Sequence, residues 1–376
     1  KSTVGQRQMK LEGSAYVDVS GKSDAEIEAL GDLWKTADNK LFGNLSSAAK
    51  FSTGGNVTLV KDYTGSSDLT ARNTCVVDFN GHTYNDQSKT DYVLAIDNGV
   101  SVTLKNGTLT SGTEHTGIIT NGTDSDINLT LQNFNLSVPN GRGIYFPSSG
   151  SVTIENSVIN AKYFGVQVCA GSLTVSGDKT AITATGAPQD KVENDGPIDD
   201  GAAVSIVNRA GYKDLGKVRI LGGAFAASNA SKAVKAYSFN NTNKTEDGWD
   251  NVKDTVSISG GYFTSNPNAY KVEGKFVVTS DKDGYSCMIS DNAPAKAEVF
   301  VDDTTAVTKP TNENLTDADK TAIQKKTKVD GVAEAVAGSK DTIVEKAGVD
   351  ASTIDATKLI EVEVAVDVAV SDVQKN

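Results

Sequence analysis

The chain has 376 residues, with 48 acidic and 36 basic side chains and a formal net charge of −12 at pH 7. That balance disfavours nucleic acid and anionic membrane surfaces as partners, because no basic face exists to release counterions. No apolar run is long enough to span a bilayer, so we expect no membrane insertion. Abundant Gly, with 38% hydrophobic residues, favours short strands and many turns. The chain begins at Lys1 without a signal-peptide pattern, so we expect a trimmed chain.

The first predicted element is an amphipathic helix over residues 23–37. Ser23 and Glu26 have the spacing of a capping box. The apolar stripe of this helix would consist of Ile27, Leu30, Leu33 and Trp34. A helix placed before stacked strands covers their open end, where core side chains and unpaired strand edges are exposed. We therefore expect residues 1–50 to form an N-terminal segment with a capping helix.

Two degenerate motifs recur after this segment. The long motif alternates apolar and polar residues around an Asn-Gly or Gly-Gly pair, and it occurs as VTLKNGTLTS (102–111), LTLQNFNLSV (129–138), VTIENSVINA (152–161), VRILGGAFAA (218–227) and VSISGGYFTS (256–265), with a truncated copy LTVSG (173–177). The short motif precedes each of these as YVLAIDNG (92–99), GIITNG (117–122), GIYFPSSG (143–150), GVQVCAG (165–171), AAVSIVN (202–208) and AVKAYSF (233–239).

One copy of each motif in every repeat of roughly 21 to 38 residues is typical of a stacked solenoid. Like segments would stack on like, so the sheets would be parallel. Within one long motif, Val102 and Leu104 would point inward, whereas Thr103 and Lys105 would point outward. The Asn and Gly residues would allow the positive φ of a tight corner. We expect a mainly β fold with a parallel β-helix over residues 51–295.

Insertions of uneven length provide the main functional clue. The segments 209–217 and 240–251 leave the same corner of successive coils, so they should lie side by side. A third insertion, at about 178–200, leaves a different corner. Insertions that gather on one side of a solenoid commonly build its binding surface. The long-loop side is therefore the predicted binding side.

Two candidate sites lie in these insertions. Exposed Tyr and Trp rings stack on sugars, which makes Tyr212 and Trp249, with Asp247 and Asp250 beside the latter, candidate glycan-binding residues; burial of the rings to anchor the loops is the alternative. Several oxygens on one flexible loop suit Ca²⁺, and a solvated acidic loop is the alternative. The candidate calcium ligands are Asp190, Glu193, Asp195, Asp199 and Asp200.

The amino-acid composition of the chain changes near its end. Residues 296–376 are interpreted as a linker and a small α+β accessory module, with a helix that begins at Thr316. Residues 360–370 alternate strictly between apolar and polar side chains, which predicts a strand. No local partner for this strand is evident, so it could complete a sheet in a neighbouring molecule.

The motif pairs, and VVDFNGHTY at 76–84 in particular, resemble the coils of right-handed parallel β-helix domains of the pectate-lyase-like superfamily. The segment 258–278 resembles a closing segment of large surface proteins of Gram-positive bacteria. This resemblance implies an extracellular or cell-wall location. It leaves the activity open, because the superfamily holds lyases, hydrolases and non-catalytic adhesins alike.

A catalytic constellation is not evident in the sequence. A lyase of this superfamily needs Asp-rich Ca²⁺ sites beside an Arg or Lys base, yet Arg142 and Arg219 lie in no recognisable catalytic run. Asp199 and Asp200 are an adjacent carboxylate pair without the supporting residues of a hydrolase. We expect a non-catalytic surface protein that displays a glycan-binding or host-binding face and assign no catalytic residue. The alternatives are a polysaccharide lyase or glycoside hydrolase, and a self-assembling surface subunit.

Overall fold

A computed structural model of the chain describes residues 15–120, 122, 125–189, 196–248 and 252–293. Its fold is mainly β, with long parallel sheets. The chain divides into two units, residues 1–257 and residues 258–376. The predicted C-terminal module at 296–376, including the helix that begins at Thr316 and the strand at 360–370, lies outside the described residues.

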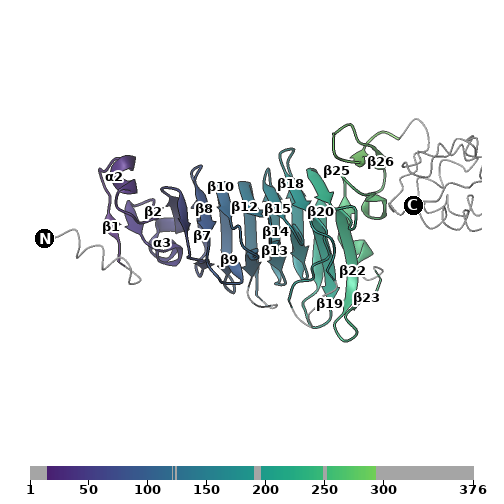
Figure 1. The fold of residues 1–376 in the computed structure, drawn as a ribbon, viewed down its shortest axis with the longest axis horizontal. Helices are drawn as coiled ribbons and strands as arrows, with labels where there is room; N and C mark the ends of the chain where they lie inside the picture. Colours follow the sequence, from purple (N-terminus) through teal and green to yellow (C-terminus); the bar gives the residue numbers. More distant parts are fainter. Residues whose placement is uncertain (1–14, 121, 123–124, 190–195, 249–251, 294–376) are drawn as a thin grey trace, which may run out of the picture. The chain divides into compact units, whose positions relative to one another are not determined.

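The short motifs form one sheet, which we call the short-motif sheet. Its order in the described chain is β23 (Thr245–Glu246), β22 (Val234–Asn240), β19 (Val204–Arg209), β16 (Val166–Val168), β13 (Arg142–Phe146), β11 (Thr116–Thr120), β9 (Tyr92–Ile96) and β6 (Leu69–Ala71). All neighbours are parallel except β22 and β23, which are antiparallel. Strands of successive coils thus pair directly, as Figure 1 shows.

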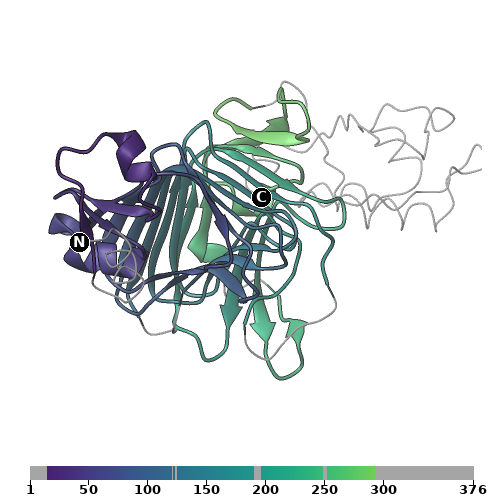
Figure 2. The same ribbon diagram turned by 60° about the vertical axis from the view of Figure 1, so that its left-hand side comes forward.

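The long motifs form the long-motif sheet, in which each coil contributes one long strand or two short ones. Its strands in the first unit are β4 (Asn56–Leu59), β5 (Tyr63–Gly65), β7 (Cys75–Asp78), β8 (Thr83–Asp86), β10 (Ser101–Thr110), β12 (Ile127–Val138), β14 (Gly150–Glu155), β15 (Val158–Ala161), β17 (Gly171–Ser176), β18 (Ala181–Ala184), β20 (Leu215–Ile220) and β21 (Ala224–Ala227). Successive coils pair in parallel, which confirms the predicted parallel sheets (Figures 1 and 2).

Apolar side chains of equivalent positions stack on one another inside the coils. Val102 of β10 is in register with Leu129, which is in register with Val152 and then with Leu173. Each of these side chains is at most 1% exposed. A one-residue slip of any strand would move its apolar side chains to the outer face, so this stacking fixes the register. The predicted inward positions of the long motif are confirmed.

An Asn or Gly residue with positive φ turns the corner within each long motif. Asn106, Asn133 and Asn156 have φ of 57°, 49° and 47°, and Gly177 and Gly223 take the equivalent corners at 92° and 107°. Asn tolerates this left-handed region better than other residues with a Cβ atom. The predicted role of these residues is therefore confirmed.

The copy at 173–177 is complete rather than truncated. After Gly177 the chain continues into β18, where Ala181 is in register with Val158 of the preceding coil. The residues between the two strands extend the corner, and the hydroxyl of buried Thr180 donates to the carbonyl of Ser176 at 2.5 Å. Four residues separate Ser176 from Ala181, whereas two separate the equivalent Glu155 and Val158, and these two extra residues obscured the second half of the motif in the sequence.

The N-terminal segment differs from the prediction. The helix α2 spans only Asp24–Glu28, and the predicted capping box between Ser23 and Glu26 is present. Gly31, with φ of 90°, separates this helix from strand β2 (Trp34–Thr36). The prediction of a helix through residue 37 is wrong because Trp34 is buried, with its ring 5.8 Å from that of Tyr84 in the second coil. Tertiary packing of the indole therefore overrides the helical spacing.

A second helix, α3 (Leu45–Phe51), was not predicted. Its N-cap residue Asn44 accepts a hydrogen bond from the backbone of Ser47, and Leu45, Ala48 and Ala49 are buried. It contacts β4 and β6, and β1 (Val17–Asp18), β2 and β3 (Lys40–Phe42) pair in antiparallel fashion before the first coil. The short turn η1 (Thr53–Gly55) follows α3.

The remaining described elements follow the last complete coil. The short turn η2 (Lys253–Thr255) leads into β24 (Val256–Ile258). In the second unit, β25 (Tyr262–Phe263) and β26 (Phe276–Thr279) both pair in antiparallel fashion with β27 (Cys287–Ser290), and η3 is Asn268–Tyr270.

All three cysteines are buried, and none of them forms a disulfide. Burial raises the pKa of the Cys75 thiol to about 12, so this side chain behaves as a small apolar residue.

Candidate functional site

Several outward-facing side chains of the short-motif sheet are buried, although they do not point into the stack. Tyr145 of β13, Val207 of β19 and Tyr237 of β22 are at most 4% exposed. They belong to an aromatic cluster with Tyr163, Phe164, Cys169, Ile198 and Phe239, and Tyr212 packs against it. Ile198 and Tyr212 come from two of the predicted insertions. The insertions therefore lie over the outer face of this sheet, on the predicted long-loop side.

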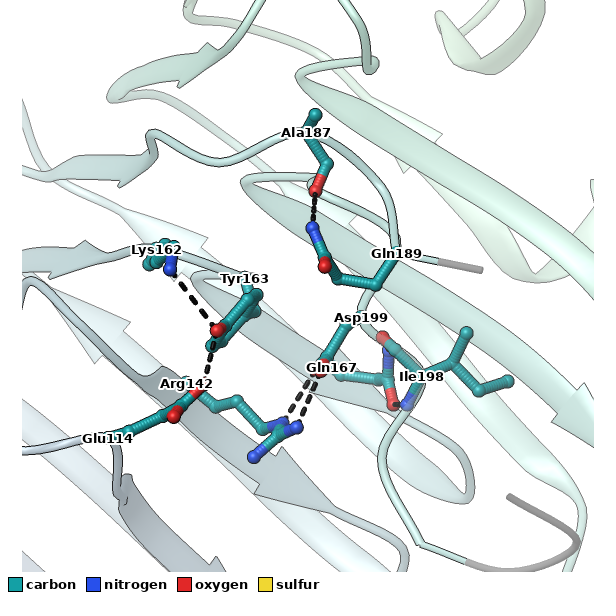
Figure 3. Close-up of polar contacts among 9 residues, drawn as sticks. All are labelled: Glu114, Arg142, Lys162, Tyr163, Gln167, Ala187, Gln189, Ile198 and Asp199. Carbon is teal, nitrogen blue, oxygen red and sulfur yellow. Dashed lines mark hydrogen bonds and ion pairs between the residues drawn. The ribbon is translucent and has the colours of Figure 1, made fainter. Parts of the chain in front are cut away.

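Gln167 anchors the end of the 178–200 insertion to β16. Its side-chain amide donates to the carbonyl of Ile198 at 2.7 Å and accepts from the Ile198 amide at 2.8 Å (Figure 3). Gln167 is fully buried, so an unmade bond here would leave buried polar groups without partners. This pair fixes the backbone immediately before Asp199.

Arg142 holds the carboxylate of Asp199. Its Nε atom donates to Oδ1 at 2.6 Å and its Nη2 atom to Oδ2 at 2.5 Å, a bidentate arrangement (Figure 3). The side chains of Arg142 and Asp199 are 26% and 10% exposed. Burial alone would lower the pKa of Arg142, but the hydrogen bonds and charge of Asp199 raise it overall. Arg142 therefore remains charged.

Three further polar side chains adjoin this pair. The hydroxyl of Tyr163 donates to exposed Glu114, and Lys162 donates to the same hydroxyl at 3.2 Å (Figure 3). The guanidinium carbon of Arg142 lies 5.2 Å from the centre of the Tyr163 ring, and the Lys162 ammonium lies 4.7 Å from it. Two cations thus contact one aromatic ring. We call Glu114, Arg142, Lys162, Tyr163 and Asp199 the polar cluster.

Asp200 lies deeper than the polar cluster. It accepts hydrogen bonds from the Ser205 hydroxyl at 2.5 Å, the Tyr237 hydroxyl at 2.8 Å and the Ala202 amide at 3.0 Å. Burial raises the pKa of Asp200, because removal from water disfavours its charged form. Its oxygens therefore connect the end of the insertion to β19 and β22.

The insertions at 209–217 and 240–251 lie side by side, as predicted. Arg209 donates to the side chain of Asn241 at 3.1 Å, and Asn241 donates to the carbonyl of Ala210 at 2.9 Å. The Arg209 guanidinium also lies 5.2 Å from the ring centre of Tyr212. Buried Arg209 donates to the carbonyl of Gly196 as well, so one cation joins all three insertions.

Tyr212, a candidate sugar-stacking residue, makes anchoring contacts. Its hydroxyl lies 2.9 Å from that of Tyr145 and accepts from the Gly196 amide at 3.4 Å. Asp247 is exposed, and its backbone amide donates to the carbonyl of Ser238 at 2.8 Å. The other two candidates, Trp249 and Asp250, lie outside the described residues.

Two of the five candidate calcium ligands lie in the described part of the chain. Asp190, Glu193 and Asp195 lie outside the described residues, whereas Asp199 and Asp200 make the contacts given above. Across the described part of the chain, no three His, Cys, Asp or Glu side chains are grouped as a metal ion would need. Calcium binding by this set stays a prediction.

Pairings across long stretches of sequence were missed by the motif analysis. Arg142 and Asp199 are 57 residues apart, and Glu114 and Tyr163 are 49 apart. Position on a repeat was the only available signal, because Arg142 directly precedes the short motif at 143–150 and is the first residue of β13. Arg219, the other arginine considered, is on the long-motif sheet. Buried His115 contacts the carbonyl of Ser88 at 2.8 Å.

Comparisons with known proteins add no relative: no family model, curated protein or solved structure matches the chain. Among the described residues, no helix has the length and apolar character needed to cross a membrane. The chemistry of the site therefore has to be argued from its own geometry. The polar cluster offers acceptor oxygens at Glu114 and donors at Lys162 beside an aromatic ring, which suits hydrogen bonding to the hydroxyls of a sugar.

Proposed function

We propose that the chain is a non-catalytic part of an extracellular or cell-surface bacterial protein, and that its long-loop side binds a glycan or host-surface ligand. We further propose that its coils form a right-handed parallel β-helix. Each coil contributes strands to both sheets, and equivalent strands pair in parallel. Connections between parallel strands of one sheet are right-handed in nearly all proteins.

One observation carries the proposal of binding rather than cleavage. Asp199 and Asp200, the adjacent carboxylates, each receive hydrogen bonds from protein donors at both side-chain oxygens. A general acid or base needs to exchange protons with its substrate, whereas these oxygens hold the insertion against the sheet. The surface beside Glu114 and Lys162 is therefore preorganised. A preorganised surface loses less conformational entropy when it binds a ligand, which favours recognition.

An incubation with acidic and neutral polysaccharides, with and without Ca²⁺, tests this function. We expect retention of the protein on at least one polysaccharide without new reducing or unsaturated ends. The double variant Glu114→Gln/Lys162→Gln should weaken that retention. The control Asp178→Asn/Lys179→Gln removes the same two charges at an exposed corner of the long-motif sheet and should leave it unchanged. Cleavage of any polysaccharide would contradict the proposal.

A second candidate is a polysaccharide lyase or glycoside hydrolase. The arrangement that favours it is the polar cluster itself, in which an exposed carboxylate, a phenol and two cations lie together. Cleavage that is lost in Glu114→Gln but retained in Asp178→Asn would support this alternative. The same assay therefore separates the two functions.

A further inference from the structure

Asn-Gly dipeptides occur at several corners of the stack, and their backbone surroundings differ. Four of them lie wholly within the described residues, at 80–81, 98–99, 106–107 and 140–141. In such a dipeptide the backbone nitrogen of Gly can attack the side-chain amide of Asn, because Gly has no Cβ atom to hinder the approach. The attack requires that both the nitrogen and the side-chain amide are able to move. The hydrogen bonds of these two groups therefore indicate which dipeptide can react.

Asn98 and Gly99 form the turn between β9 and β10. The amide of Val100 donates to the carbonyl of Asp97 at 3.3 Å, and Gly99 has φ of 69°. This pattern is typical of a type II turn, whose own hydrogen bond does not use the amide of its third residue. Within the described residues, neither the Gly99 amide nor the Asn98 side chain has a hydrogen-bond partner, and both residues are exposed. Both reacting groups are thus free to approach each other.

The glycine amide is held in two of the other three dipeptides. Gly81 donates to the carbonyl of Asn106 at 2.6 Å, and Gly141 donates to the carbonyl of Val138 at 2.9 Å. The nitrogen must lose its proton when it attacks, so each of these hydrogen bonds has to break first. Breaking them raises the barrier to the reaction at both positions.

The side-chain amide is also held in two of these dipeptides. Nδ2 of Asn140 donates to the carbonyl of Gly112 at 2.8 Å, and Nδ2 of Asn106 lies 3.2 Å from both carboxylate oxygens of Asp78. Gly107 is in addition a residue of β10, where strand pairing restricts its backbone. Each of the three dipeptides therefore has at least one reacting group held, whereas the turn between β9 and β10 has neither.

We propose that Asn98 is a site of spontaneous deamidation, with water as the only other reactant. The Gly99 nitrogen forms a bond to Cγ of Asn98 as the bond from Cγ to Nδ2 breaks. The proton of the Gly99 amide ends on the departing nitrogen, which leaves as ammonia. Water then opens the resulting succinimide ring at one of its two carbonyls. One opening gives aspartate, and the other gives isoaspartate, in which the main chain passes through the former side chain.

Either product changes the corner where the second coil passes into the third. It adds a negative charge next to Asp97, whose carboxylate lies 3.6 Å from Nε of exposed Arg72. Isoaspartate also lengthens the main chain by one atom, close to buried Val100. Asn98 follows β9, whereas the parallel strand β13 begins at Arg142, so the two residues lie at opposite ends of the strands of the short-motif sheet. Deamidation is therefore independent of the binding function proposed above.

Ageing of the full chain at mildly alkaline pH and physiological temperature tests this proposal. Proteolytic digestion and tandem mass spectrometry at successive times measure the conversion of each amide to an acid, and chromatography separates the aspartate and isoaspartate products. In the folded chain we expect conversion at Asn98 to be at least about fivefold faster than at Asn80, Asn106 or Asn140. In denaturant the four should convert at similar rates, because the hydrogen bonds that distinguish them are absent.

The variant Asn98→Gln provides the matched control at this exposed position. It keeps an amide, but attack by the next nitrogen would then close a six-membered ring, which forms more slowly. The peptide that carries residue 98 should therefore lose its rapid conversion, while the slow conversion at Asn140 stays unchanged. Equal rates at Asn98 and Asn140 in the folded chain would overturn the proposal. Retained rapid conversion of the peptide in Asn98→Gln would overturn it as well, because the ammonia would then come from another residue.

Discussion

The two sheets bury equivalent apolar side chains inward, yet their outward faces differ. On the short-motif sheet, outward Gln167 is fully buried and anchors an insertion, whereas outward Gln132 on the long-motif sheet is partly exposed and donates to Glu155 at 3.1 Å. The coils thus supply one fold for both faces, and the insertions alone decide which face is covered. Polar residues under the insertions become structural, while those on the other sheet remain partly exposed.

Replacement of an arginine on each sheet should give the largest difference in stability between the two faces. Arg142→Ala would leave the largely buried carboxylate of Asp199 without its partner, so we expect a loss of about 3 kcal/mol in the free energy of unfolding. Arg219→Ala, on the exposed face of the long-motif sheet, should change stability by no more than about 0.5 kcal/mol. Urea unfolding of both variants measures the difference. Equal losses would show that the insertion does not depend on the ion pair.

Replacement of Gln167 and Gln132, which face outward on the two sheets, should give a smaller difference in stability. Gln167→Ala removes both hydrogen bonds to the backbone of Ile198 in a buried position, for which we expect a loss of about 2 kcal/mol. Gln132→Ala removes one partly exposed hydrogen bond and should cost about 0.5 kcal/mol or less. Hydrogen exchange at the Ile198 amide provides a local measurement. If exchange there is as slow in Gln167→Ala as in the wild type, the assigned anchoring role is wrong.

The repeating strands could be predicted because their signal is local and recurs. Val102, Leu129 and Val152 alternate with polar neighbours in each motif, and the repeat itself places them in register. The helix at 23–37 was mispredicted because the spacing of Ile27 and Trp34 fits a helical stripe. Burial of Trp34 against Tyr84 of another coil determines the structure there, and no local pattern reports such a contact.

The candidate site was predicted only in its location. Uneven insertion lengths correctly indicated that segments 209–217 and 240–251 lie side by side. The partner of Asp199 could not be inferred, because the path of an insertion across a sheet follows no periodicity. Asp199 was therefore grouped with its acidic neighbours in sequence rather than with Arg142.

The smallest expected change in stability concerns the corner between the two halves of each long motif. Asn133 has φ of 49°, so Asn133→Ala should cost about 1 kcal/mol, whereas Asn133→Gly should cost less because Gly adopts this region without strain. Asn135→Ala, two residues further along β12, is the control in extended backbone and should change stability by about 0.5 kcal/mol or less. Thermal unfolding of the three variants ranks them. Equal destabilisation of the alanine and glycine variants at 133 would show that side-chain contacts of Asn133, rather than its backbone conformation, stabilise the corner. The stack would then depend on polar contacts at its corners as well as on those beneath the insertions.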